Sequence, residues 1–147
     1  IILMHMQGTP FTMQNNPLYD DVVDTLLAFF EDRIERALNA GISSDKIIID
    51  PGIGFGKTIL DNDKIISNID KLKSLGFPIL IGLSRKSFLQ CNNDLPSERL
   101  ATTILANILS LLNGADIIRV HDVEEHIKIR MVLSRISSEL SGRLYGS

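Results

Sequence analysis

Four short apolar runs rich in isoleucine alternate along this chain with longer segments of helical period. The runs cover residues 1–6, 46–50, 78–82 and 116–120, and each is apolar at successive positions. Strands that are covered on both faces need such continuous apolar sequence, because neither face meets water. The alternation therefore predicts an α/β fold with parallel strands.

Helical segments are expected at residues 19–40, 61–75 and 96–114, and again after the last strand. Gly41 follows the first segment as a stop signal, and Asp122 precedes the last one as the N-cap of a capping-box variant. The resulting order is β-α-β-α-β-α-β-α. Four such units form half of an eight-stranded (β/α)8 barrel or a small doubly wound sheet, and the pattern alone favours neither.

Composition excludes several classes of function. The 147 residues carry a net charge of −3, so we expect no general attraction to nucleic acid or to an anionic membrane. No apolar run approaches the roughly 20 residues of a membrane span. The single cysteine, Cys91, excludes an internal disulfide and suits a reducing compartment, so we expect a cytoplasmic protein. The chain begins at Ile1 inside an expected strand, which indicates a fragment of a longer polypeptide.

The end of the second run offers the first candidate site. Asp50 is followed by a glycine-rich loop at residues 51–57 that contains Phe55. A carboxylate there can accept two parallel N–H bonds from a planar, guanidine-like edge, while glycines allow close approach of a flat ligand. Phe55 would add an aromatic wall. The alternative is a plain strand-to-helix turn with Asp50 as a local cap.

The third and fourth runs end in cations. Residues 84–87 read Ser-Arg-Lys-Ser, and residues 119–122 read Arg-Val-His-Asp. Alternation along a strand puts Arg119 and His121 on the same side, where they could hold an anion. In (β/α)8 barrels the loops after strands seven and eight commonly bind phosphate. The alternatives are a solvated basic turn at residues 84–87 and an ordinary core histidine at His121.

Two other histidines are assigned no chemistry. His5 alternates with Met4 and is expected to pack or to support the site from behind, and His126 is expected on the surface of the last helix. Neither has a cysteine or histidine neighbour at metal-ligand spacing.

Four motifs together resemble dihydropteroate synthase. They are Met-His-Met-Gln-Gly at residues 4–8, Asp-Pro-Gly-Ile-Gly-Phe-Gly-Lys at 50–57, Gly-Leu-Ser-Arg-Lys-Ser at 82–87 and Arg-Val-His-Asp at 119–122. Each motif is modest alone, and the four in this order and spacing are specific. The resemblance implies a (β/α)8 TIM barrel of which this chain is the C-terminal (β/α)4 half, comprising strands five to eight.

The resemblance also implies a transferase of folate biosynthesis. Its substrates would be 7,8-dihydropterin-6-ylmethyl diphosphate and p-aminobenzoate, its products 7,8-dihydropteroate and pyrophosphate, and sulfonamides would compete with p-aminobenzoate. The implied catalytic residues are Arg119, His121 and Lys86, of which Arg119 and His121 would hold the pyrophosphate. The implied pterin-binding residues are Asp50, Lys86, Met4, Gly82 and Arg119, and the implied p-aminobenzoate pocket contains Phe55, Ser87 and Gly54.

The resemblance leaves the metal outside this chain. Mg²⁺ is the implied cofactor, and its ligand would lie in the N-terminal half of the barrel, as would two mobile loops. A catalytically silent fragment is therefore one alternative, and a pterin-binding methyltransferase domain of the cobalamin-linked type is another.

A homodimer through the last helices is also expected. The segment 96–114 carries more apolar residues than one stripe on a barrel helix requires. The resemblance to dihydropteroate synthase likewise implies such a dimer.

Overall fold

The predicted alternation of strands and helices is confirmed in a computed structural model, which describes the backbone of residues 1–145 and the side chains of residues 1–136. The elements are β1 (Ile2–Met4), α1 (Val22–Asn39), β2 (Ile48–Asp50), α2 (Ile59–Ser67), α3 (Ile69–Lys73), β3 (Leu80–Ile81), α4 (Leu100–Leu112), β4 (Ile117–Ile118) and α5 (Val123–Tyr145). Three 3₁₀ turns, η1 (Ser44–Lys46), η2 (Ser87–Leu89) and η3 (Pro96–Glu98), lie between them.

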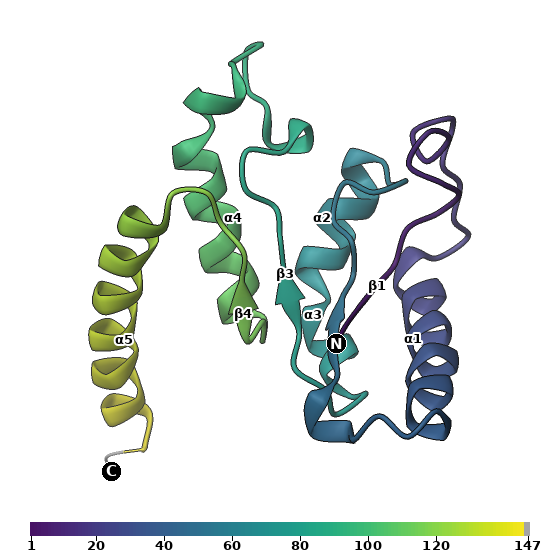
Figure 1. The fold of residues 1–147 in the computed structure, drawn as a ribbon. Helices are drawn as coiled ribbons and strands as arrows, with labels where there is room; N and C mark the ends of the chain where they lie inside the picture. Colours follow the sequence, from purple (N-terminus) through teal and green to yellow (C-terminus); the bar gives the residue numbers. More distant parts are fainter. Residues whose placement is uncertain (146–147) are drawn as a thin grey trace.

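The strands pair in parallel and in chain order. Met4 of β1 lies opposite Asp50 of β2, and Ile81 of β3 lies opposite Ile118 of β4. A single bridge between Ile49 and Ile79 joins the two pairs. Figure 1 shows the strands between α1 and α5, the first and last helices. Each strand is shorter than predicted, because only a few residues in each run make the ladder hydrogen bonds.

Helix α1 follows directly from its sequence. The Asp21 side chain accepts hydrogen bonds from the backbone N–H groups of Val23 and Asp24, which satisfies two donors of the first turn. Gly41 ends the segment with a φ of 86°, as predicted. Leu38, at the last turn, is 42% exposed and lies outside the buried stripe of this helix.

The predicted helix at 61–75 is two helices. Asn68 has φ −129° and ψ 30°, which is not helical, and it ends α2 and precedes α3. The helix α2 begins with a capping box between Thr58 and Asp61. The inward positions Ile65, Ile69 and Leu72 are buried as predicted, so the break redirects the backbone without moving the apolar face.

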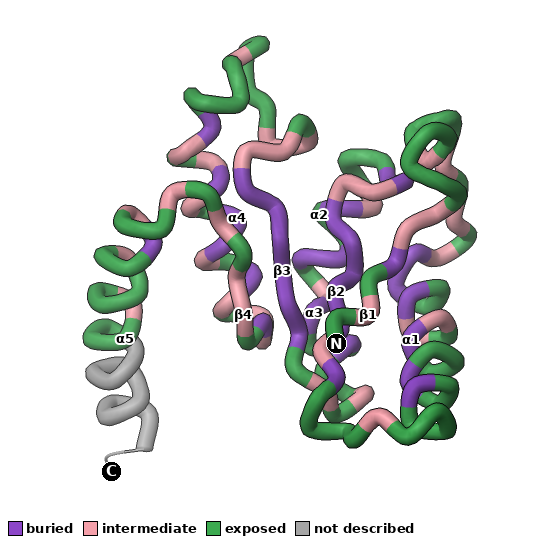
Figure 2. The backbone as a smooth tube through the Cα atoms, viewed as in Figure 1, coloured by how far each residue is buried: buried purple, intermediate pink, exposed green. Residues whose placement is uncertain are grey.

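The core lies between β2, β3 and the helices α1 to α3 (Figure 2). Ile49 and Ile81 are fully buried, whereas Ile2 of β1 is about half exposed. The ladder of each outer strand, β1 and β4, has one neighbour in the described structure. None of the helices within residues 1–145 is long and apolar enough to cross a membrane.

Candidate active site

Asp50 and Arg119 form the centre of the site at the C-terminal ends of the strands. Asp50 is 1% exposed, and its Oδ1 accepts the backbone N–H of Gly52 at 2.8 Å. Its Oδ2 accepts a hydrogen bond from an Nη of Arg119 at 3.0 Å. The Arg119 side chain is about half exposed, so one partner of this pair is buried and the other meets solvent. The local cap expected as the alternative for Asp50 is therefore present, and it leaves the second oxygen available to a cation.

Gly82 allows the Arg119 guanidinium to reach this position. A Cβ on Gly82 would lie 2.7 Å from an Nη of Arg119, closer than a Cβ carbon approaches another heavy atom. Any larger residue at the end of β3 would displace the guanidinium from Asp50. Gly82 thus contributes space rather than a contact of its own.

Lys86 and Phe55 form a second cluster beside Asp50. The Lys86 Nζ lies 4.2 Å from the centroid of the Phe55 ring, and it donates a hydrogen bond to the carbonyl of Ile53. Burial lowers the pKa of Lys86 to about 8, although the charge of Asp50 acts in the opposite direction. A Cβ on Gly54 would meet the Lys86 Cδ at 3.1 Å, so Gly54 lets the lysine stem lie along the loop.

Arg85 does not share the role of Lys86. It lies in the left-handed region with φ 59°, and its guanidinium forms two hydrogen bonds to the carboxylate of Asp122. In this structure the guanidinium of Arg85 is therefore held by Asp122, whereas the Lys86 ammonium lies over Phe55. Asp122 was predicted as a capping residue, but both of its carboxylate oxygens bind Arg85, and the pair ties the loop after β3 to the loop after β4.

His121 and Ser87 lie at the edge of this arrangement. The His121 Nδ1 is 3.0 Å from the Ser84 Oγ, and its backbone N–H also donates to this hydroxyl, at 3.3 Å. Ser87 is exposed in η2 and lines a pocket of about 330 Å³ together with Gly54. Met4, at the end of β1, is 37% exposed and lies opposite Asp50 in the ladder. The predicted residues thus gather at one edge of the sheet, with Asp50, Lys86 and Arg119 closest together.

Lys57 and His5 support the site from behind, and only Lys57 received no assigned role from the sequence. Lys57 is 5% exposed and its Nζ is 3.0 Å from the Nδ1 of His5. The prediction that His5 packs behind the site is confirmed, since it is buried and its ring meets Phe29 edge-on at 4.8 Å. Lys57 appeared only as the last letter of the glycine-rich motif, and no sequence signal distinguished a buried lysine from an exposed one there.

Residues 1–121 match the family model described as pterin binding enzyme. The chain belongs to this family. In this chain a buried carboxylate lies nearest the strand ends, beside a glycine-rich loop and two cations.

Curated relatives and solved structures extend the family assignment. The chain is 39% identical to the dihydropteroate synthase of Escherichia coli strain K12 over 146 residues, which is 99% of this chain and 52% of the relative. It is 44% identical over 131 residues to that of Synechocystis sp., covering 88% of this chain and 45% of the relative. A Yersinia pestis dihydropteroate synthase solved with a sulfonamide drug aligns with a TM-score of 0.90 at 38% identity, over 94% of this chain and 51% of that structure. The chain therefore spans about half the length of the relatives it matches.

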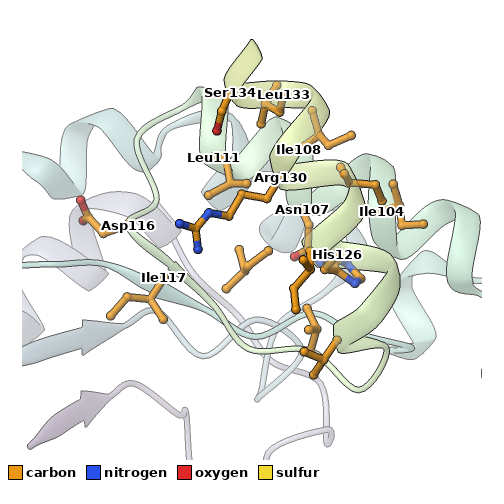
Figure 3. Close-up of a pocket in the computed structure, with 15 residues that line it drawn as sticks. Ile104, Asn107, Ile108, Leu111, Asp116, Ile117, His126, Arg130, Leu133 and Ser134 are labelled. Atoms are coloured by element: carbon orange, nitrogen blue, oxygen red, sulfur yellow. The ribbon is translucent and has the colours of Figure 1, made fainter. Parts of the chain in front are cut away.

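A separate cleft lies away from the candidate site residues. It has a volume of about 600 Å³ and lies between α4, β4 and α5, with the side chains drawn in Figure 3 around it. Asp50, Lys86, Arg119 and His121 do not line it. His126, predicted on the surface, is buried in its wall, where its Nε2 lies 2.8 Å from the Asn107 Nδ2. The prediction for His126 is wrong because α5 turns this residue toward α4.

Proposed function

We propose that the protein carrying this sequence is a dihydropteroate synthase. The observation that carries the proposal is the similarity to dihydropteroate synthases over 99% of the chain, with the candidate site residues at the ends of the strands. In this proposal the four parallel β/α units are strands five to eight of a (β/α)8 barrel. The strand order supports it, because β1 to β4 neighbour one another in sequence order.

Asp50 would bind the amino-pyrimidinone edge of the pterin. Its Oδ2 accepts a hydrogen bond from Arg119, and we propose that a ligand with two adjacent N–H groups displaces the guanidinium. Arg119 would then be free to stack on the pterin and to meet the diphosphate. Met4 and Gly82 would line the pterin slot, and the Lys86 ammonium would meet the pterin carbonyl. Displacement of Arg119 from Asp50 would thus couple pterin binding to recognition of the diphosphate.

The reaction would break the bond between the pterin methylene carbon and the diphosphate oxygen. The electron pair leaves with pyrophosphate, and Arg119 and His121 would stabilise the developing negative charge. The p-aminobenzoate nitrogen forms the new bond to the methylene carbon and loses one proton. An arylamine is already a nucleophile, so no general base is assigned among the described residues. Phe55, Gly54 and Ser87 would shape the pocket for p-aminobenzoate, and sulfonamides would compete there.

Mg²⁺ is not assigned to any residue described here. No group of three or more His, Cys, Asp or Glu side chains within residues 1–136 is placed to hold a metal ion. The proposal therefore derives no step through the metal.

The test uses the intact protein that carries this sequence. It is incubated with 7,8-dihydropterin-6-ylmethyl diphosphate and p-aminobenzoate, and dihydropteroate and pyrophosphate are measured. The Asp50→Asn variant keeps an oxygen for the Gly52 N–H but cannot accept two N–H bonds as a charged group. We expect it to lose at least about tenfold in pterin affinity by calorimetry, since a charged hydrogen bond contributes roughly 1.5–3 kcal/mol.

The matched control is Asp63→Ala, which changes an exposed carboxylate on α2 and should bind pterin like the parent. An intact protein that forms no dihydropteroate would refute the proposed activity. Unchanged pterin affinity in Asp50→Asn would remove Asp50 from the site.

A further inference from the structure

Every backbone carbonyl of the loop at residues 52–56 accepts a hydrogen bond from a side chain. Lys57 donates to Gly52 at 3.0 Å and to Phe55 at 3.2 Å, and Lys86 donates to Ile53. The other two donors come from the segment before α1, as Gln14 donates to Gly54 at 2.8 Å and Tyr19 to Gly56 at 2.7 Å. The conformation of this loop is therefore held by side chains rather than by a helix or a strand ladder.

Lys57 makes the most contacts to this loop. Its Nζ has three partners, which are the two carbonyls and the Nδ1 of His5, and an ammonium has three protons to donate. His5 is itself fixed, because its ring is buried against Phe29 and its backbone N–H donates to the Asp50 carbonyl. Lys57 thus anchors the loop to the ends of β1 and β2.

The position of Phe55 depends on this anchor. The Phe55 N–H donates to the Gly52 carbonyl at 3.0 Å, and its own carbonyl accepts from Lys57. Gly52 must be glycine for the turn to approach His5 this closely, since its φ is +67° and a Cβ there would lie 1.9 Å from the His5 carbonyl oxygen. Both backbone polar groups of Phe55 are consequently set by contacts that converge on Lys57.

Burying a lysine side chain in this space carries a desolvation cost. Burial lowers the pKa of Lys57 to about 7, although the charge of Asp50 raises it. An apolar side chain of similar length would avoid the desolvation of the amine but would leave the Gly52 and Phe55 carbonyls without this donor. The lysine is therefore suited to fix the loop rather than to fill the core.

We propose that Lys57 is a positioning residue that holds Phe55 beneath the Lys86 ammonium and thereby sets the pocket for the arylamine substrate. The inference rests on the proposed function for the identity of that substrate. Lys57 also lines the 330 Å³ pocket beside Gly54 and Ser87, but its ammonium is not available to substrate, because its three N–H groups are used within the protein. The backbones of Asp50, in β2, and of Gly82, directly after β3, are in contrast fixed by the strands.

The experiment compares the two substrates of the intact protein. In Lys57→Met we expect the KM for p-aminobenzoate to rise roughly tenfold to a hundredfold, the range for loss of charged hydrogen bonds. The KM for the pterin diphosphate should change less than about threefold, because the strands fix the backbones of Asp50 and Gly82. Tyr19→Phe removes only the donor to Gly56 and should raise the p-aminobenzoate KM by a smaller factor in the same direction.

Two controls separate positioning from general damage. Lys64→Met makes the same chemical change at a half-exposed lysine paired with Asp21 and should leave both KM values unchanged. Lys57→Cys, made in a background in which Cys91 and every other cysteine of the intact protein is replaced by Ser, is alkylated while unfolded with 2-bromoethylamine, which restores an ammonium of nearly equal reach. After refolding, this protein should regain most of the affinity for p-aminobenzoate.

Equal rises in both KM values, or no recovery in the alkylated protein, would overturn the proposal. If Lys57→Met does not fold, Tyr19→Phe and Gln14→Leu decide it, and unchanged p-aminobenzoate KM in both would overturn it. If the parent protein has no synthase activity, the proposed function fails instead. Amide hydrogen exchange then tests Lys57 alone, since exchange at Phe55 should accelerate in Lys57→Met and not in Lys64→Met.

Discussion

The guanidinium of Arg119 lies on the carboxylate of Asp50, joining the loop after β4 to the end of β2 across 69 residues of sequence. The contact occupies the oxygen of Asp50 that is not bound by Gly52. In the proposed function, a ligand that pairs with Asp50 displaces Arg119 from this oxygen. This competition predicts that substitutions will affect the binding of the pterin ring and the binding of the diphosphate differently.

Arg119→Ala should distinguish the binding of the diphosphate from the binding of the pterin ring. We expect the pterin diphosphate to lose at least about tenfold in affinity, because a cation aimed at the anion is removed. The affinity for the free pterin alcohol should change little. The variant loses any contact between the pterin and Arg119, but the Asp50 carboxylate no longer binds Arg119 and is open to the pterin. Calorimetric titration with both ligands measures the difference.

His121→Ala is the companion variant. It should also weaken only the diphosphate-bearing ligand, and by less, because His121 lies at the edge of the site on Ser84. Equal losses for the two ligands in both variants would show that Arg119 and His121 are structural.

Pterin affinity should fall as pH rises through about 8. Burial lowers the pKa of Lys86 to about 8, so its ammonium loses a proton near that pH and interacts less strongly with a carbonyl oxygen. Binding is measured between pH 7 and 9 in the parent and in Lys86→Arg. Arginine keeps its charge throughout this range, so the variant should show only the titration of the ligand itself. The same slope in both proteins would exclude Lys86 as the cause.

Stability should fall with acidification between about pH 6.5 and 4. Burial, assisted by the neighbouring charge of Lys57, lowers the pKa of His5 from 6.5 to about 4. In this window the unfolded chain binds a proton at His5 and the folded chain does not, so the free energy of unfolding falls as pH decreases. The full effect is on the order of 3 kcal/mol. At pH values above 6.5 both states are neutral at His5 and this contribution is constant.

Urea denaturation at several pH values measures this dependence. His5→Asn places an oxygen near the former Nδ1 and cannot titrate, so its unfolding free energy should depend less on pH between 6.5 and 4.5. Carboxylates such as Asp21, whose pKa is lowered to about 2, act below this window. A variant with the slope of the parent would show that His5 is not the titrating group.

The outer face of α4 is the expected subunit contact. Leu105, Leu109 and Leu112 are 58%, 45% and 63% exposed, and their spacing puts them on one face. We propose that this face is buried in a homodimer, and we expect Leu109→Glu in the intact protein to yield monomers by light scattering. Leu60→Glu is the matched control, because Leu60 is 79% exposed on α2. A dimeric Leu109→Glu protein would place the interface elsewhere.

The sequence by itself determined the order of the elements and which polar residues lie at the strand ends. Apolar runs, turn glycines and capping residues act over a few positions, so strands, helices and strand ends could be inferred from local pattern. Parallel strands place their carboxyl ends at one edge, which is why Asp50, Lys86 and Arg119 could be predicted to converge. The inward face of the second helical segment followed for the same reason, although its break at Asn68 did not.

The tertiary structure decided which polar groups pair. Arg85 and Lys86 are adjacent and chemically similar, yet the left-handed backbone at Arg85 sends one cation to Asp122 and the other to Phe55. Whether a charged or polar residue is buried depends on chain segments distant in sequence, as for Lys57 beneath the loop and His126 against α4. Such pairings reflect the balance between desolvation and hydrogen bonding in three dimensions, which no local pattern encodes.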